Sequence, residues 1–195
     1  MIRFVISALC FIISIELTNC SRANTQQELH KFINSTINIP NIDVVQNGIL
    51  MDSLQHALPP NIKLINYYTP AKGCVSCWIS HLYDIDLYLE DKINEYFTPV
   101  VIILIDENNE DEVLSQLKRQ PHCYPIYIDK NKQFERKNTT LPSDYKFHTF
   151  LVDRNNKVVL IGNPLNGDAM WNLFKSTLEN MLAHDGEYVP ENRRS

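Results

Sequence analysis

The feature that most constrains the fold of this chain is a pair of cysteines between a predicted strand and a predicted helix. Residues 62–68 form a short apolar and aromatic run that ends at a Thr-Pro turn signal, and Cys74 and Cys77 follow it closely. Beyond the pair, apolar residues recur at spacings of three and four along 75–97, which predicts a helix that Pro99 closes. The pattern therefore predicts a strand-to-helix turn that carries both thiols.

In the other segments, the spacing of apolar residues alternates between that of strands and that of helices, which predicts an α/β domain. The β-branched run 100–105 is typical of a strand covered on both faces of a mostly parallel sheet. Acidic residues at 110–112 suit the start of a helix capped by Asn108 or Asn109. Further strands are expected at 124–128, 147–152 and 157–161, the last two as an antiparallel hairpin, and further helices over 28–37 and from Asn166 or Asp168 to Leu182, with a polar surface connection over 129–144. This order predicts a central mixed β-sheet with helices on both faces.

The N-terminus has the pattern of a targeting segment. Arg3 precedes an apolar run over 4–15, which is about half the ~20 residues that a bilayer-spanning helix needs. The run leads to the sequence Leu-Thr-Asn before Cys20, which resembles a bacterial lipobox. That resemblance implies a lipoprotein signal peptide over 1–19 and a lipid on Cys20, which anchors the mature chain to a membrane outside the cytoplasm. An uncleaved short anchor and ordinary secretion are the alternatives.

The domain organisation follows from these signals. We expect a lipidated tether and N-terminal extension over 20–60, in which the polar residues 21–27 form the tether. An α/β domain is expected over 61–184, in which the cysteine pair between strand and helix resembles the arrangement of thioredoxin-like proteins, and a polar tail is expected over 185–195. An extracytoplasmic location, in the periplasm or at the outer membrane of a bacterium, is one in which disulfides form and persist.

Charge and cysteine count exclude two classes of protein. The net charge is −5 and the basic residues form no stripe, which argues against nucleic acid as a partner. Loss of Cys10 with the signal peptide and modification of Cys20 leave three cysteines, Cys74, Cys77 and Cys123. Three are too few for a disulfide-stapled scaffold, so the close pair is predicted to serve chemistry.

The predicted position of the pair suggests a role for each thiol. At a helix N-terminus, the sulfur of Cys74 lies near unpaired backbone N–H groups, which favour the thiolate. Cys77, three residues later, returns to the same side of the helix and can attack a mixed disulfide on Cys74. Cys74 is therefore the expected nucleophile and Cys77 the expected resolving thiol.

The residues around the pair resemble the tethered, extracytoplasmic thioredoxin-like proteins that reduce or exchange disulfides, including those that serve cytochrome c maturation. The likeness spans 61–182, with matches at 66–68, 73–77 and 149–153. It implies a redox-active centre at Cys74 and Cys77, no organic cofactor, and partners that are disulfide- or thiol-bearing envelope proteins. The family's cis-proline aligns with Phe147, and we expect the bond before Phe147 to be trans.

Two other functions are compatible with the same residues. The first is a binding module of the envelope that keeps a thioredoxin fold and a structural disulfide without catalysis. The second is a metal site in which His148 joins Cys74 and Cys77, with water or Cys123 as fourth ligand. His81 and His122 are weaker candidates, and Cys123 is expected to be a small buried side chain. The direction of the redox reaction is not encoded in these motifs.

Overall fold

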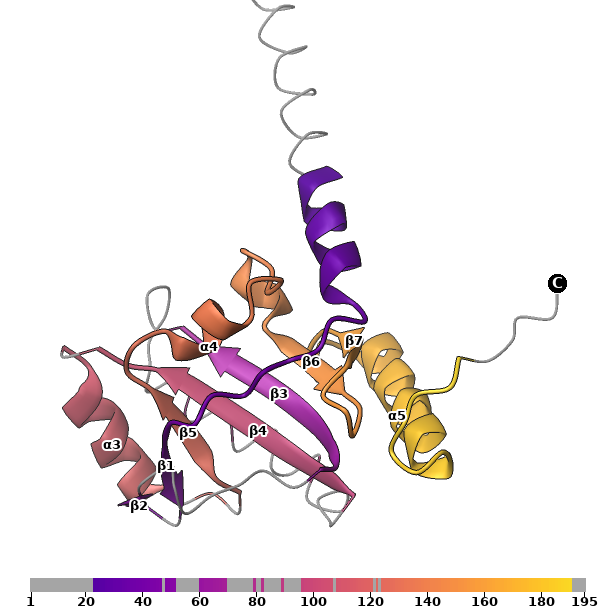
Figure 1. The fold of residues 1–195 in the computed structure, drawn as a ribbon. Coiled ribbons are helices and arrows are strands. Elements are labelled where there is room, and N and C mark those ends of the chain that lie inside the picture. Colours follow the sequence, from indigo (N-terminus) through magenta and orange to yellow (C-terminus); the bar gives the residue numbers. More distant parts are fainter. Residues whose placement is uncertain are drawn as a thin grey trace, which may run out of the picture.

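The computed structural model describes residues 23–46, 48–51, 60–69, 96–106, 108–120 and 124–190, together with Ile79, Leu82, Leu89 and His122. A seven-stranded sheet in the order β2-β1-β5-β4-β3-β6-β7 forms the centre (Figure 1). The strands are β1 (Asp43–Gln46), β2 (Ile49–Met51), β3 (Ile62–Tyr68), β4 (Phe97–Leu104), β5 (Ile126–Asp129), β6 (Thr149–Val152) and β7 (Val158–Ile161).

The sheet is mixed, as the order of elements predicts. β3, β4 and β5 are parallel to one another in the middle of the sheet. β6 and β7 continue it on one side as an antiparallel hairpin, and β1 and β2 close the other side in antiparallel pairing. β3 is buried over all but its last residue, and all but one residue of β4 is buried, which explains why their sequences are almost continuously apolar.

Each face of the sheet carries a separate apolar core. On one face, α3 (Glu110–Arg119) and α5 (Asp168–Ala183) pack with the helical residues Ile79, Leu82 and Leu89. On the other face, α4 (Gln133–Lys137) and the chain leading into β1 cover the strands through Phe32, Ile37, Ile42 and Phe134. Figure 1 shows this leading segment crossing the sheet before it enters β1. The predicted α/β layering is therefore confirmed.

Helices α3 and α5 form close to where the sequence predicts them. In α3 three acidic residues occupy the first turn, and Asn109 is the N-cap, although its side chain accepts a hydrogen bond from the backbone N–H of Asp106 instead of capping the helix. In α5 Phe174, Leu178 and Met181 are buried as expected. Leu182, expected on the same face, is 43% exposed, because it directly follows the buried Met181 and so lies about 100° further round the helix. Among the described residues, no helix is long and apolar enough to cross a membrane.

The predicted boundary between the helix over 75–97 and the next strand is wrong. Phe97 begins β4, and Pro99 lies inside this strand opposite Leu64. The N–H of Ile62 bonds to Tyr96, so by alternation the backbone polar groups of Pro99 face away from β3. β5 pairs with β4 only from Val101 onward, so the donor that proline lacks has no ladder partner to lose.

The N-terminal extension differs from the prediction in two ways. A helix spans 23–32 instead of 28–37, so most of the expected tether is helical. The helix ends because Asn34 adopts a left-handed conformation with φ 69°, and the chain continues in an extended form through Ile37. The N–H of Asn34 and that of Ile37 then bond to the carbonyls of Val158 and Asn156, so this segment lines the edge of β7.

The polar stretch 129–144, expected to be a surface connection, contains the short helix α4 and several buried side chains. Asp129 is fully buried, and its carboxylate accepts hydrogen bonds from the backbone N–H groups of Asn131, Gln133 and Phe134. These bonds fix the start of α4 and turn the ring of Phe134 into the core. Asn138, also buried, bonds through its amide to both the N–H and the carbonyl of Asn38.

Candidate functional site

All the cysteines lie outside the described residues, so the structure does not test the predicted chemistry of Cys74 and Cys77 or the predicted lipidation of Cys20. Cys123 and His81 are outside them as well. The structure does describe both ends of the segment that holds the pair. β3 ends at Tyr68, six residues before Cys74, and Ile79, two residues after Cys77, is helical and fully buried. The pair thus lies, along the chain, between a described strand and a described helical position.

The turn before β6 lies beside the end of β3. The 3₁₀ turn η4 (Tyr145–Phe147) is capped by Asp144, whose carboxylate accepts from the N–H of Lys146. The next residue, His148, accepts a hydrogen bond at its backbone carbonyl from the N–H of Tyr67 at 3.0 Å. The chain therefore leaves β3 toward the cysteines from a point adjacent to the residues that align with the family's proline loop.

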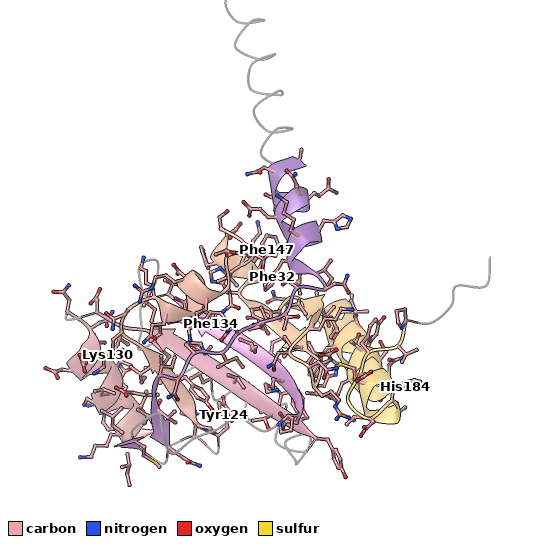
Figure 2. All side chains as sticks on the ribbon, in the orientation of Figure 1. Phe32, Tyr124, Lys130, Phe134, Phe147 and His184 are labelled. Atoms are coloured by element: carbon pink, nitrogen blue, oxygen red, sulfur yellow. The ribbon has the colours of Figure 1, made fainter. Side chains whose placement is uncertain are left out.

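Phe147 is the residue expected from the sequence to align with the cis-proline of the resembled family. No cis peptide bond occurs among the described residues, so the bond between Lys146 and Phe147 is trans, as predicted. The Phe147 ring is half-buried (Figure 2). The ammonium of Lys146 lies 4.8 Å from its centroid, so an aromatic ring beneath a cation directly precedes His148.

His148 is the titratable side chain that the structure places at this junction. The residue is 6% exposed, and its Nε2 lies 2.9 Å from the carbonyl oxygen of Pro142. A carbonyl only accepts, so Nε2 carries the proton and Nδ1 keeps a free lone pair. Nδ1 is buried and has no hydrogen-bond partner among the described residues. Burial lowers the pKa of His148, an effect that its bond to Pro142 and the charges of Glu135 and Asp144 offset in part.

Tyr67 connects His148 to α4. Its ring packs 5.5 Å from that of His148 and 4.8 Å from that of Phe134, measured between centroids. Its hydroxyl donates to Oε1 of Glu135 at 3.2 Å. Burial raises the pKa of Tyr67, and the charges of Glu135 and Asp129 raise it further. Tyr67, His148 and Glu135 thus form a cluster of two aromatic rings and one carboxylate next to the turn before β6. Within this cluster the hydroxyl of Tyr67 stays protonated.

The sequence indicates His148 as a candidate functional residue, but it does not predict that Tyr67 and Glu135 lie beside it. Glu135 belongs to the stretch interpreted as a surface connection, where its helical position depends on the buried Asp129. The one signal in the sequence is Phe134, an isolated large apolar residue in a polar stretch. His122, the other described histidine candidate, is 4% exposed, with its ring 5.9 Å from that of Tyr124. No group of three or more metal-ligating side chains occurs among the described residues, none of which is a cysteine.

Replacing His148 by glutamine is expected to flatten the acid side of the pH–stability profile. Because the folded chain holds this ring at a lowered pKa, the unfolded chain binds a proton at pH values where the folded chain does not. The free energy of unfolding therefore falls as the pH falls below about 6.5. Glutamine can still donate to Pro142 but does not titrate. Thermal melts from about pH 5 to 7.5 test this.

The exposed His30, changed to glutamine, is the matched control for that experiment. Its variant keeps His148 and should therefore still lose stability as the pH falls. If the His148 variant follows the wild type, then this ring takes up its proton equally in the folded and unfolded chain, and its burial has no electrostatic consequence.

Comparison with known proteins identifies the fold. No protein-family model and no curated protein sequence matches the chain. Among solved structures, it is similar to the C-terminal domain of a protein described as a thiol-disulfide oxidoreductase from Bacteroides thetaiotaomicron, with a TM-score of 0.50 and 18% identity over 77% of this chain and 99% of that chain. It is also similar to the thioredoxin domain of a thiol-disulfide oxidoreductase from Bacteroides vulgatus (TM-score 0.47, 16% identity, 75% of this chain and 97% of that chain) and to a thioredoxin-like protein from Porphyromonas gingivalis (0.47, 16%, 80% and 97%). At such identities the likeness concerns the fold alone, and the predicted fold class is confirmed.

Proposed function

We propose that this chain, which has a thioredoxin-like fold, is a thiol–disulfide oxidoreductase of the cell envelope that uses Cys74 and Cys77 as its redox pair. The observation that carries the proposal is the place of the pair along the chain. It follows β3, the strand beside the turn before β6, and it precedes the buried helical position Ile79. In this fold, such a position joins a central strand to the N-terminus of a helix, where a thiolate is stabilised.

The proposed reaction is a two-electron thiol–disulfide exchange. The Cys74 thiolate attacks one sulfur of a partner disulfide, which forms a mixed disulfide and releases the other partner sulfur as a thiolate. The Cys77 thiolate then attacks the sulfur of Cys74 and releases the second partner thiol. The partner is reduced by two electrons, and the pair is oxidised to a disulfide. The same steps run in reverse when the chain acts as an oxidant.

The partners and the location are part of the same proposal. Envelope proteins that bear disulfides or thiols are the proposed substrates, since the predicted leader directs the chain to a compartment where disulfides persist. Cys20 is the proposed lipid attachment site and holds the chain at the membrane. The support for both is the sequence that ends at Cys20. No nucleic acid and no organic cofactor enters the proposal.

The reduction potential of the Cys74–Cys77 pair tests the proposal directly. The pair is equilibrated with glutathione buffers in the chain that begins at Ser21, which retains both apolar cores because their buried members lie between Phe32 and Met181. Alkylation and mass spectrometry then report the oxidised fraction. We expect a reversible pair between about −120 and −270 mV, the range of known oxidoreductases, and the value sets the direction of the reaction.

Two results contradict catalysis by this pair. A disulfide that resists reduction at potentials well below about −300 mV indicates a structural bond, as in a binding module that has kept the fold. A pair that never oxidises, and that protects zinc from a chelator, indicates the metal site with His148 instead.

A further inference from the structure

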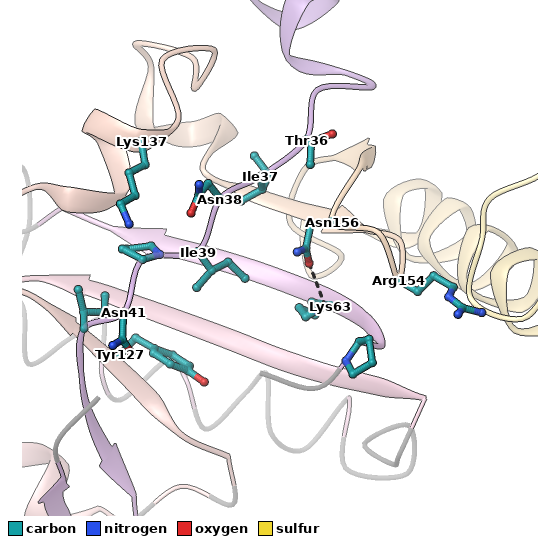
Figure 3. Close-up of a pocket in the computed structure, with 13 residues that line it drawn as sticks. Thr36, Ile37, Asn38, Ile39, Asn41, Lys63, Tyr127, Lys137, Arg154 and Asn156 are labelled. Atoms are coloured by element: carbon teal, nitrogen blue, oxygen red, sulfur yellow. Dashed lines mark hydrogen bonds between the residues drawn. The ribbon is translucent and has the colours of Figure 1, made fainter. Parts of the chain in front are cut away.

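A cavity lies on the sheet face that the N-terminal extension covers. It has a volume of about 760 Å³ and is bounded by the segment 36–42, by Pro60 and Lys63 at the start of β3, and by Tyr127 of β5 (Figure 3). Asn156 and Arg154, between β6 and β7, complete one wall, and Lys137 of α4 reaches toward the opposite end. The cysteine pair follows the last residue of β3, so this cavity is at the other end of that strand.

Lys63 is the buried cation of the cavity. Its residue is only 2% exposed, and its ammonium donates to the carbonyl oxygen of Asn61 at 2.7 Å and to Oδ1 of Asn156 at 2.9 Å. An ammonium has three donors, so one remains without a partner among the described residues. Burial lowers the pKa of Lys63 to about 8, against the opposing charge of Asp153. Asp153 is thus the nearby opposite charge, but no described carboxylate forms an ion pair with the Lys63 ammonium.

The described charged side chains that line the cavity are basic. They are Lys63, Lys137 and Arg154, and no carboxylate lines the cavity among the residues that the structure describes, although the chain as a whole carries a net charge of −5. Arg154 is already paired with the carboxylate of Asp185 and points toward α5. Lys63 on the floor and Lys137 at the rim therefore supply the charge that a bound anion would meet.

The uncharged lining is mixed: Thr36, Asn38, Asn41 and Asn156 contribute polar groups, and its apolar part comes mainly from three isoleucines and Tyr127. Ile37, Ile39 and Ile42 of the N-terminal extension form one wall, and the ring of Tyr127 lies across from Ile39 (Figure 3). The hydroxyl of Tyr127 has no hydrogen-bond partner among the described residues, and burial raises the pKa of this group to about 12, so it stays protonated and can donate. A bare inorganic anion would leave most of this volume and these apolar walls unused.

We propose that this cavity binds an amphipathic organic monoanion, with its carboxylate on the Lys63 ammonium and its apolar body along the isoleucine wall. The free third donor of Lys63 bonds to the carboxylate, and the apolar chain displaces water from Ile39 and Tyr127. The cysteines have no role in the proposed binding, so the proposal stands independently of the redox function.

Isothermal titration calorimetry with octanoate, on the chain that begins at Ser21, tests the proposal. Octan-1-ol has the same apolar chain without the charge, and acetate has the charge without the chain. We expect octanoate to bind with a Kd of about 10–100 μM and each comparison ligand to bind at least about tenfold more weakly. Equal binding of octan-1-ol indicates a plain apolar cavity, and equal binding of acetate indicates a bare anion site; either result overturns the proposal, as does the absence of octanoate binding.

The variant Lys63→Met is expected to weaken octanoate binding roughly 10- to 100-fold, the loss of one charge-assisted hydrogen bond. Lys118→Met, a change of an exposed lysine in α3, is the matched control and should bind as the wild type does. If the Lys63 variant folds and binds octanoate normally, this lysine is structural only and the proposal fails.

A measurement on the wild type keeps the proposal testable even if the Lys63 variant does not fold. A carboxylate beside Lys63 raises its pKa, so at about pH 8 binding should draw up to about half a proton from solution. Titrations in buffers of different ionisation enthalpy report this uptake. Binding without proton uptake places the anion elsewhere and overturns the assignment to Lys63.

Discussion

Replacement of Cys77 by serine is expected to leave a chain that attacks a disulfide but cannot complete the exchange. The Cys77→Ser variant should accumulate a mixed disulfide between Cys74 and its partner, because no second thiol releases it. The Cys74→Ser variant should form no such adduct, because the attacking thiolate is missing. In both variants turnover of a fluorescence-quenched disulfide peptide should fall by roughly 10³-fold or more. Non-reducing mass spectrometry identifies the trapped species.

Cys123→Ser is the matched control for these variants, since it removes a thiol that the proposed reaction does not use. Its turnover should stay within about twofold of the wild type. If instead Cys123→Ser abolishes turnover while Cys77→Ser does not, the resolving thiol is Cys123. A wild-type chain that turns over no disulfide peptide, and whose Cys77→Ser variant traps none, is a binding module.

Replacement of Phe32 by alanine is expected to lower the free energy of unfolding by about 3–5 kcal/mol, the usual loss for a fully buried phenylalanine. Phe32 has no exposed surface, and its ring meets that of Phe150 edge-on, with centroids 4.9 Å apart. Residues preceding β1 thus belong to the core of the sheet face that also holds Tyr67 and Phe134. Urea denaturation followed by circular dichroism measures the effect.

Tyr145→Ala is the control for the Phe32 variant, because Tyr145 is 56% exposed and its removal opens no internal cavity. Its effect should stay below about 1 kcal/mol. An equally small effect of Phe32→Ala would mean that the N-terminal extension packs on the sheet without contributing to its stability.

Much of the fold could be predicted because its central elements have strong local patterns. The second half of β4 is a continuous apolar run, and β3 is apolar or aromatic at every position except Lys63 and Asn66; such runs fit a buried strand or helix. Three acidic residues indicate the first turn of α3, and a short polar turn separates β6 from β7. In each of these elements the local sequence and the final packing favour the same conformation.

The incorrect predictions occur where the local sequence fits two structures. Phe97 continues the apolar spacing of the preceding helix, yet the same side chain fills the core from a strand, and only the pairing with β3 decides between them. Asp129 and Asn138 are predicted to be surface residues because they are polar. Their side chains instead bond to backbone groups of turns that the sequence does not predict. The partners of Tyr67 and His148 were missed for the same reason.

The cysteine pair and the cavity around Lys63 differ in the same way in how far the sequence predicts them. The order of strand, cysteine pair and helix is a local property, so the sequence alone suggests its chemistry. The cavity around Lys63 is not local, because its walls come from the N-terminal extension, from β5 and from the turn at Asn156. A lysine at the start of an apolar strand gives no indication that three distant segments will enclose it.

The bonds that tie the N-terminal extension to the rest of the sheet also set the order in which the chain can fold. Asn38 pairs with Asn138, 100 residues further along the chain, and β1 pairs with β5 over a comparable separation. At about 5–20 residues per second, roughly 5–20 s pass between the synthesis of these partners. The N-terminal extension is synthesised before the strands of the sheet, yet it is among the last segments to pack in its final position. Until β5 and the final hairpin are present, part of the sheet face that this segment covers is missing.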